Sequence, residues 1–240
     1  MSSVVKRLRV FAGPNGSGKS TLTSIIGNQF HLGTYVNADE IKVCAVNTGR
    51  IDFSSFNVEI TEDSVELELS QSNFVRAFSR RDWKYENNGI SFNDKNKVDD
   101  YFVAFLADVI RKKLLEQGAR FSFETVMSHQ SKIDFMKIAK EKGFKVYLYF
   151  VSLTDPHLNV LRVQTRVKEG GHNVDESKIV DRYSRTMDNL VDAIKIADSA
   201  YIFDNSGSEI KLIAQKENGK LFTMGEYVPL WYKKYVLEKL

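Results

Sequence analysis

Apolar residues along this chain form two kinds of pattern, short β-rich runs and longer stretches with helical spacing. The run over residues 145–151 is apolar on both faces, which is typical of a central strand in a parallel sheet. The β-rich runs predict five strands, over residues 8–12, 34–37, 120–126, 145–151 and 200–206. Apolar positions three or four apart predict helices over residues 19–27, 99–117, 131–142, 156–169, 175–197 and 230–240.

Strands and helices therefore alternate, which predicts an α/β fold of three layers with a parallel central sheet. A hairpin about Asn218 and Gly219 follows the last of these strands. Ligands of such sheets bind beyond the carboxyl ends of the strands, and the polar clusters of this chain follow strands at those ends.

Residues 50–98 do not follow the alternation. They contain no proline and many aromatic residues, which predicts an ordered insertion within a single domain of residues 1–240. A hairpin is expected about Asn87, Asn88 and Gly89. The insertion follows the second strand, so we expect it on the acceptor side of the site. Its aromatic residues could form a satellite core, or its cations could line a pocket for an anionic acceptor: Arg76, Arg80, Arg81 and Lys84.

Composition narrows the class of protein. The chain has 240 residues and a net charge of +3, too balanced to indicate nucleic-acid or membrane binding. Its single cysteine, Cys44, excludes an internal disulfide and suits a reducing compartment. The longest apolar run, residues 146–153, is too short to span a bilayer, and residues 1–7 carry no export signal. We therefore expect a cytoplasmic protein.

The motif G-x-x-x-x-G-K-[ST] is complete between the first strand and the first helix. A strand, a glycine-rich turn and a helix N-terminus form a phosphate cradle (a P-loop), because backbone N–H groups and the helix dipole point at the anion. Lys19 would reach the β- and γ-phosphates of ATP, and the Ser20 hydroxyl would bind Mg²⁺. The expected nucleotide-binding residues are Gly13, Pro14, Asn15, Gly16, Ser17, Gly18, Lys19, Ser20 and Thr21. The alternative is a chance glycine-rich turn.

Two carboxylates stand at the ends of predicted strands, Asp39 just after the second and Glu124 near the end of the third. Asp39 could orient or deprotonate an acceptor hydroxyl, or it could only cap the helix that follows. Glu124 could hold a Mg²⁺-bound water or a substrate hydroxyl, or it could pair with a surface lysine. Thr125 and Ser128 come next to Glu124 and are candidate contacts to the acceptor substrate.

Cations and amides follow later strands. Arg162 and Arg166 are four positions apart and so share one helix face, from which they could stabilise the transferred charge. A solvated basic face is the alternative. Arg182 and Arg185 lie three apart on the next helix, beyond a hinge at residues 168–173. Asn205, at the end of the fifth strand, could contact the adenine or the triphosphate, or belong only to a polar turn.

With these motifs in hand, the chain resembles the zeta toxin-like P-loop kinases, in the branch labelled predicted ABC-type ATPase. The segments that carry the resemblance are residues 13–21, 37–41, 123–125, 162–167, 170–174, 182–183 and 204–206. They occur in the order that the family shows. The branch label does not describe a mechanism, because the Leu-Ser-Gly-Gly-Gln segment of ABC ATPases is absent.

The resemblance implies a P-loop kinase fold with strand order 2-3-1-4-5 and dependence on ATP and Mg²⁺. It implies that Asp39 is the general base, that Lys19 binds phosphate, and that Arg162 or Arg166 contacts the γ-phosphate. Zeta toxins phosphorylate the 3′-hydroxyl of UDP-N-acetylglucosamine, so the acceptor would be this or a related sugar nucleotide. The resemblance leaves open whether an antitoxin is a partner.

Two departures from the family concern the acceptor, namely the long segment 50–98 and the string Thr-Val-Met-Ser at residues 125–128. A second function class also stays open, a P-loop NTPase that acts as a regulatory switch or binding module. Carboxylates at two strand ends favour the kinase, because a switch needs no acceptor base.

Overall fold

The computed structural model describes residues 5–72, 82–171 and 174–240. The chain divides into two compact units. We call Met1–Leu32 with Ser122–Leu240 the P-loop unit, and Gly33–Phe121 the middle unit. The expected insertion, residues 50–98, lies within the middle unit.

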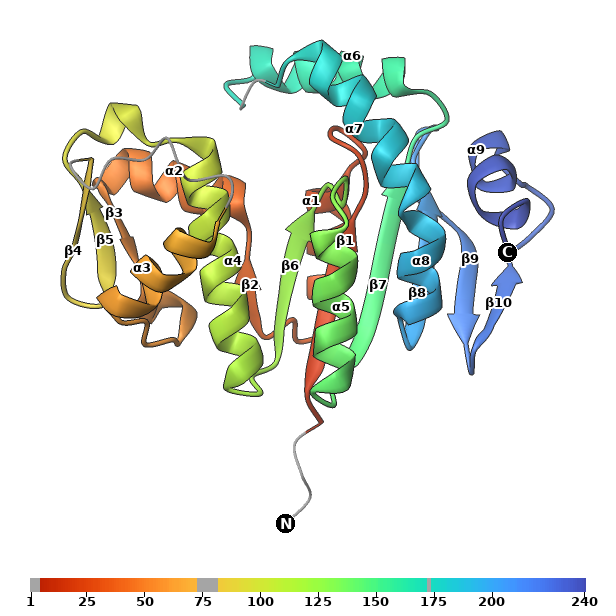
Figure 1. Ribbon diagram of the computed structural model, residues 1–240. Coiled ribbons are helices and arrows are strands. Elements are labelled where there is room, and N and C mark those ends of the chain that lie inside the picture. The colour runs from red at the N-terminus through yellow and green to blue at the C-terminus, as the bar shows by residue number, and fades with distance from the viewer. Residues whose placement is uncertain (1–4, 73–81, 172–173) are drawn as a thin grey trace. The chain divides into compact units, whose positions relative to one another are not determined.

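The sheet of the P-loop unit confirms the α/β class, with strands in the order β10-β9-β8-β7-β1-β6 (Figure 1). β1 pairs with β7, and β7 with β8, in parallel registers. β6, β1, β7 and β8 are the third, first, fourth and fifth of the five predicted strands, so their order matches the 3-1-4-5 part of the expected order. The expected order did not include the antiparallel strands β9 and β10. The bounds are β1 (Arg7–Ala12), β6 (Phe121–Thr125), β7 (Lys145–Ser152), β8 (Ser199–Asp204), β9 (Lys211–Glu217) and β10 (Lys220–Thr223).

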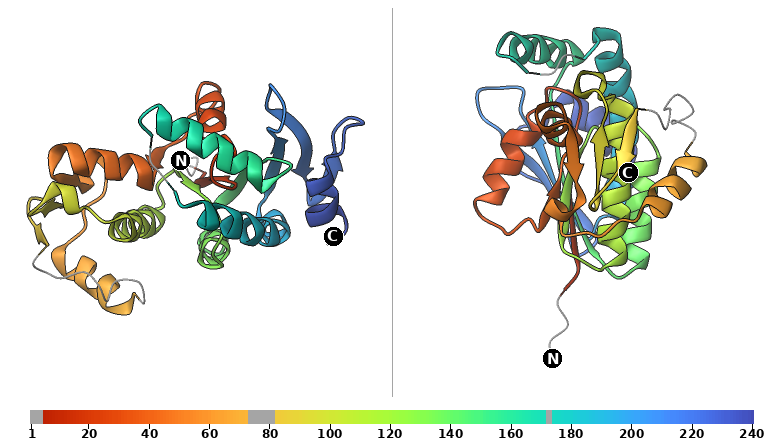
Figure 2. Two further views of the ribbon diagram at one scale, coloured as in Figure 1. Left: turned by 90° about the horizontal axis from the view of Figure 1, so that it is seen from above. Right: turned by 90° about the vertical axis from the view of Figure 1, so that its left-hand side faces the viewer.

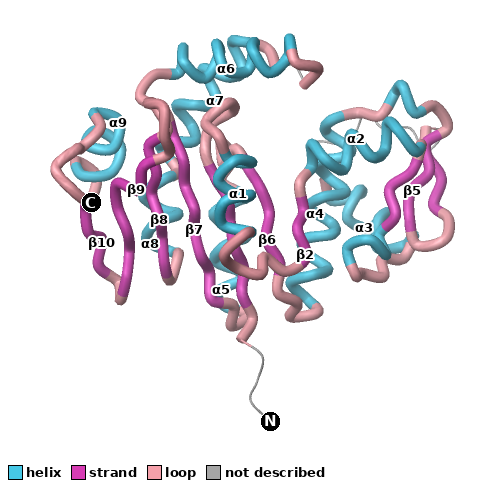
Figure 3. Tube along the Cα trace, turned by 180° about the vertical axis from the view of Figure 1, so that it is seen from behind, coloured by secondary structure: helices cyan, strands magenta, loops and turns pink. Residues whose placement is uncertain are grey.

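Local sequence explains the edge and the centre of this sheet. Asn218 and Gly219 have φ of 48° and 79°, which a tight β-hairpin between β9 and β10 requires. β7 is buried along nearly its whole length, as its two-sided apolar pattern predicts. Helix α1 (Lys19–Gly27) covers one face of the sheet, and α5 (Ser131–Glu141) and α8 (Leu190–Ile196) cover the other (Figures 1 and 3). The three expected layers are therefore present.

Two further helices, α6 (Pro156–Lys168) and α7 (Glu176–Asp188), lie beyond the carboxyl ends of the strands (Figures 1 and 2). They pack on each other through Val160, Val163 and Ile179. The single helix expected over residues 175–197 is wrong. It breaks at Asn189, whose amide donates to the Met127 carbonyl at 2.9 Å, and α8 then turns down along the sheet.

The C-terminal helix expected over residues 230–240 is shorter and less regular than predicted. It consists of α9 (Leu230–Tyr232) and a π-helical turn, Lys233–Leu237.

The middle unit contains a small antiparallel sheet in the order β3-β5-β4, with its own core. The expected hairpin is confirmed between β4 and β5, with Asn87 and Asn88 at positive φ. Trp83 and Phe102 are buried with their ring centroids 5.6 Å apart, which supports the satellite-core interpretation. The bounds are β2 (Thr34–Val36), α2 (Ala38–Thr48), β3 (Arg50–Asp52), α3 (Glu62–Gln71), β4 (Trp83–Tyr85), β5 (Gly89–Phe92) and α4 (Asp100–Glu116).

Of the four cations expected beside an acceptor, Lys84 is exposed on β4 and forms an ion pair with Glu86 at 3.1 Å. Arg76, Arg80 and Arg81 lie outside the described residues. In the part of the chain that the structure describes, no helix is both long and apolar enough to cross a membrane.

Candidate nucleotide-binding site

The P-loop is a tight turn between the end of β1 and the start of α1. Gly13 has a φ of 148°, and a Cβ atom there would lie 2.0 Å from the Val151 carbonyl oxygen of β7. Gly18 has a φ of 99° and is the N-cap of α1. Only glycine allows this backbone to bend so sharply and to pass so close to the neighbouring strand.

Lys19 is the first residue of α1, and its side chain turns back onto the loop. The Lys19 Nζ donates to the carbonyl oxygens of Gly13 and Pro14, both at 3.0 Å. The first turn of α1 contains no acidic side chain. The ammonium charge and the positive end of the helix dipole therefore act together, as a polyphosphate site requires.

Glu124, in β6, lies against the same helix. Its Oε2 accepts from the Ser20 hydroxyl at 3.1 Å and its Oε1 from the Thr23 hydroxyl at 2.8 Å. Two hydroxyls thus orient the carboxylate beside the side chain expected to bind Mg²⁺. Carboxylate and hydroxyl oxygens are the hard ligands that Mg²⁺ prefers, so these residues fit the ion. Sequence analysis missed Thr23, although its three-residue spacing from Ser20 places both on one helix face.

Helix α6 and the loop after β8 are bonded to the P-loop. The Asn205 amide donates to the Ser17 carbonyl at 2.9 Å, and Arg162 donates to the Asn205 carbonyl at 2.7 Å. Asn159 is fully buried and donates to the Asn15 carbonyl at 2.6 Å. Asn159 was not among the expected site residues, because it is one polar residue within an apolar helix face.

Three side-chain oxygens around the P-loop are buried and find no hydrogen-bond donor among the described residues. They are Asn15 Oδ1, Ser17 Oγ and Asn159 Oδ1. Buried polar atoms of this kind call for a water or a ligand, because leaving an acceptor unpaired costs about 1–3 kcal/mol.

The four arginines of the expected basic faces lie on two helices, Arg162 and Arg166 on α6 and Arg182 and Arg185 on α7. Arg162 reaches the loop beside the P-loop, but Arg166 is exposed near the C-terminal end of α6, and its side chain lies next to Gly171. Arg185 is exposed and pairs with Asp181 within α7. The hinge residues 172 and 173 lie outside the described residues.

The turn after β6 is held in a strained shape. Met127 is buried with a φ of 60°, unusual for a residue other than glycine, and its N–H donates to the Thr125 hydroxyl at 3.0 Å. Thr186 of α7 donates to the Val126 carbonyl at 2.8 Å. Thr125 therefore shapes the turn, and Ser128 follows it half-buried.

Residues behind the site fix the strand ends. Asp204 is buried and accepts from Trp231 Nε1 at 2.7 Å and from the Ser206 hydroxyl at 2.9 Å. The Tyr183 hydroxyl donates to the Leu153 carbonyl at 2.9 Å, and burial raises the pKa of Tyr183 to about 12. The loops after β7 and β8 are thus anchored from both sides.

Asp39 belongs to the middle unit. Asn37, not Asp39, is the N-cap of α2, with its Oδ1 accepting from the Asp39 N–H at 3.0 Å. The alternative in which Asp39 caps the helix is therefore wrong. Its carboxylate is exposed and makes no hydrogen bond or ion pair within residues 5–72, 82–171 and 174–240.

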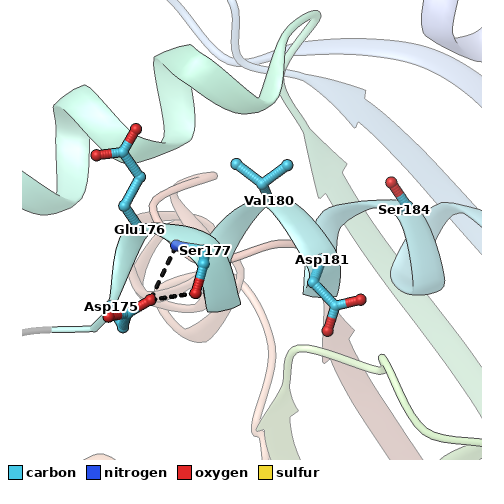
Figure 4. A pocket seen from close by; sticks show the side chains of 6 residues that line it. All are labelled: Asp175, Glu176, Ser177, Val180, Asp181 and Ser184. Carbon is cyan, nitrogen blue, oxygen red and sulfur yellow. Dashed lines mark hydrogen bonds between the residues drawn. The ribbon is translucent and has the colours of Figure 1, made fainter.

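A shallow hollow also runs along α7, and its lining is acidic (Figure 4). Asp175 caps the helix, and hydrogen bonds from Ser177 and Lys178 lower the pKa of the Asp175 carboxyl. Three carboxylates there would repel a polyphosphate, so we do not assign the nucleotide to this hollow. The lining residues are Asp175, Glu176, Ser177, Val180, Asp181 and Ser184.

Comparison with known proteins identifies a family. The model of the zeta toxin family matches residues 91–217, just over half of the chain. An uncharacterized protein of Haemophilus influenzae is 38% identical over 69 residues, which cover 29% of this chain and 49% of that protein. The chain thus spans about half the length of this curated relative. The P-loop and Asp39 lie outside the family match.

Solved structures agree on the fold. A complex of AvrRxo1-ORF1 and AvrRxo1-ORF2 with sulphate ions has a TM-score of 0.56 at 15% identity, covering 92% of this chain and 61% of that one. The same complex with ATP has a TM-score of 0.54 at 15% identity, over 92% and 61%. The PezAT toxin–antitoxin system of Streptococcus pneumoniae has a TM-score of 0.50 at 18% identity, over 88% and 73%. At these identities the likeness shows the fold alone.

Proposed function

This chain belongs to the zeta toxin family, and on that premise we propose that it is a kinase that transfers the γ-phosphoryl group of ATP to a hydroxyl of a small molecule. The observation that carries the proposal is the pairing of Ser20 with Glu124 at 3.1 Å directly beside Lys19. It joins a phosphate-binding helix end to a carboxylate, an arrangement suited to a Mg²⁺-bound nucleotide.

The site residues of the P-loop unit have separate roles in this proposal. Lys19 and the N-terminus of α1 bind the β- and γ-phosphates. Ser20 would hold Mg²⁺ directly and Glu124 through a water, and the ion would supply charge neutralisation on the phosphates. Arg162 would contact the transferred group, and the more exposed Arg166 is the alternative.

The chemical step is a simple exchange of bonds. The acceptor oxygen forms a bond to the γ-phosphorus while the bond from that phosphorus to the β–γ bridging oxygen breaks, and ADP leaves. Asp39 is proposed to take the hydroxyl proton of the acceptor, as a general base does. Its exposed carboxylate has no described partner to keep it from a substrate.

The nucleotide and the acceptor have different support. ATP is present in the AvrRxo1-ORF1:AvrRxo1-ORF2 complex of the same fold, which supports ATP as the donor. For the acceptor we propose UDP-N-acetylglucosamine or a related sugar nucleotide, on family resemblance, with Thr125 and Ser128 as its contacts. The exposed free thiol of Cys44 suits a reducing compartment, and we place the activity in the cytoplasm.

We also propose an antitoxin partner. The PezAT system is named as a toxin–antitoxin pair, and it shares the fold of this chain. A partner that blocks the nucleotide site would lower ATP affinity when the two proteins are mixed. Nucleotide titration with and without the candidate partner measures that effect.

The proposed activity is tested by incubating the protein with ATP, Mg²⁺ and a panel of hydroxyl acceptors, and by reading phosphorylated products by mass spectrometry. We expect ADP release to depend on one class of acceptor, and Lys19→Ala to abolish it. ADP release that is equally fast without any acceptor would favour the alternative, a P-loop NTPase acting as a switch. A wild-type protein that neither binds nor turns over ATP would refute both.

A further inference from the structure

Two residues of α6 are bonded toward the P-loop from one helix face. Asn159 and Arg162 are three positions apart, so their side chains point the same way. Asn159 donates to the carbonyl of Asn15, at 2.6 Å, within the P-loop itself. Arg162 instead donates to the carbonyl of Asn205, at 2.7 Å. The direction of the Arg162 guanidinium therefore depends on Asn205, in the loop after β8.

Asn205 connects three parts of the unit. Its backbone N–H donates to the Ser152 carbonyl at the end of β7, at 2.9 Å, and its side chain donates to the Ser17 carbonyl at 2.9 Å. Its exposed fraction is 9%. Its amide nitrogen lies so close to the P-loop that a Cβ atom on Gly18 would meet it at 2.4 Å. The side chain is thus packed against the P-loop.

The hydrogen bond of Arg162 to Asn205 depends on the hydrogen bond of Asn205 to Ser17. The acceptor of the Arg162 bond is the backbone carbonyl of Asn205, and that carbonyl cannot shift freely while the Asn205 amide is bonded to Ser17. An arginine that has to meet a developing charge needs its position held within about 0.5 Å, and a loose side chain loses that advantage. A displacement of the loop after β8 would displace the guanidinium as well.

We propose that Asn205 is a positioning residue that aligns Arg162 with the P-loop for phosphoryl transfer. The proposal rests on the proposed function and replaces a direct nucleotide contact as the role of Asn205. If Asn205 contacted the nucleotide directly, substituting it would weaken ATP binding. If Asn205 positions Arg162, substituting it should lower turnover, and only in a protein that still contains Arg162.

The test is a double-mutant cycle with wild type, Asn205→Ala, Arg162→Ala and the double variant. The kcat and the KM for ATP are measured from ADP release with the acceptor found in the screen, and folding is checked by thermal unfolding. We expect Asn205→Ala to lower kcat about tenfold or more, with the KM for ATP within about threefold. In the Arg162→Ala background, the second substitution should change kcat by less than about twofold.

Ser208→Ala is the matched control. Ser208 lies in the same loop as Asn205 and is exposed, and among the described residues its side chain makes no hydrogen bond with the P-loop or Arg162, so kcat should stay near the wild-type value. Asn205→Asp keeps the shape of the side chain but places an oxygen against the Ser17 carbonyl, so it should lose as much turnover as Asn205→Ala. If Asn205→Ala does not fold, Asn205→Ser takes its place under the same criteria.

The outcomes separate the inference from the function on which it rests. A raised KM for ATP with kcat unchanged, or losses in kcat that multiply in the double variant, would overturn the positioning role while leaving the kinase intact. A wild-type protein without acceptor-dependent turnover would refute the proposed function, and the positioning role with it.

Discussion

Glu124 in the P-loop unit and Asp39 in the middle unit both follow or end a strand, but their surroundings differ. Glu124 is half-buried and accepts from two hydroxyls of α1. Asp39 is exposed in the first turn of α2, and its carboxylate accepts no hydrogen bond within the described residues. A carboxylate held by two donors is suited to a fixed task, whereas an unheld one is available to a substrate proton. Under the proposed function, environment divides two like groups between two roles.

The same contrast extends to the two units. In the P-loop unit, hydrogen bonds join the P-loop to α6, to β6 and to the loop after β8. In the middle unit the best-defined contacts are apolar, around Trp83 and Phe102. The nucleotide side is therefore organised before a ligand arrives, which lowers the cost of binding.

Loss of the P-loop cation should give the largest effect. Lys19→Ala removes the charge expected on the β- and γ-phosphates, so turnover should fall by roughly 10³-fold or more. The Lys19 side chain is half-buried and outside the apolar core, so the unfolding midpoint should stay close to that of wild type. Turnover is measured as ADP release, and Lys137→Ala, an exposed lysine of α5, is the matched control. Unchanged turnover would refute the P-loop assignment.

Neutralising Asp39 tests the exposed carboxylate of the middle unit. Asp39→Asn should lower phosphoryl transfer by about two to four orders of magnitude, as loss of a general base does, and should leave ATP affinity within a few-fold. Single-turnover rates and nucleotide titration measure the two quantities. Glu40→Gln changes the neighbouring carboxylate of the same helical turn and should have little effect. If Asp39→Asn abolished ATP binding, Asp39 would have to be assigned to the nucleotide or its metal.

Neutralising the held carboxylate should have a smaller effect of a different kind. Glu124→Gln keeps the shape and weakens the orientation of Ser20, so turnover should fall by about 10–100-fold and the Mg²⁺ concentration needed for half-maximal rate should rise. Titration of the rate with Mg²⁺ measures this shift. If Glu124→Gln lost as much turnover as Asp39→Asn and added Mg²⁺ did not restore it, the distinction between the two carboxylates would be refuted.

The smallest effect concerns the anchoring of the P-loop unit. Tyr183 has a folded-state pKa of about 12 against an ordinary value of 10.0, so its contribution to stability is present below pH 10 and is lost as the pH rises toward 12. Tyr183→Phe should cost about 1 kcal/mol at pH 8 through the lost bond to Leu153, and the gap to wild type should narrow above pH 10. Urea unfolding at pH 8 and pH 10.5 measures both differences. A gap that widens with pH would contradict this sign.

Much of the fold could be predicted because its signals are local. The P-loop occupies eight consecutive residues, and the hairpin turns at Asn88 and Asn218 contain the asparagines and glycines that positive φ requires. The alternation of strands and helices likewise follows from apolar spacing alone. The family resemblance inferred from these motifs is confirmed by the family match.

The class of fold, the P-loop motif and the family could therefore all be predicted from the amino-acid sequence. Which side chains meet could not, because that depends on the folded chain. Ser20 and Glu124 are 104 positions apart, and Asn159 and Asn15 are 144 apart. The break at Asn189 likewise depends on Met127, 62 positions away. Contacts over such separations produce no periodic pattern in the sequence. Each depends on where the sheet brings distant segments together, and local residue preferences do not encode that geometry.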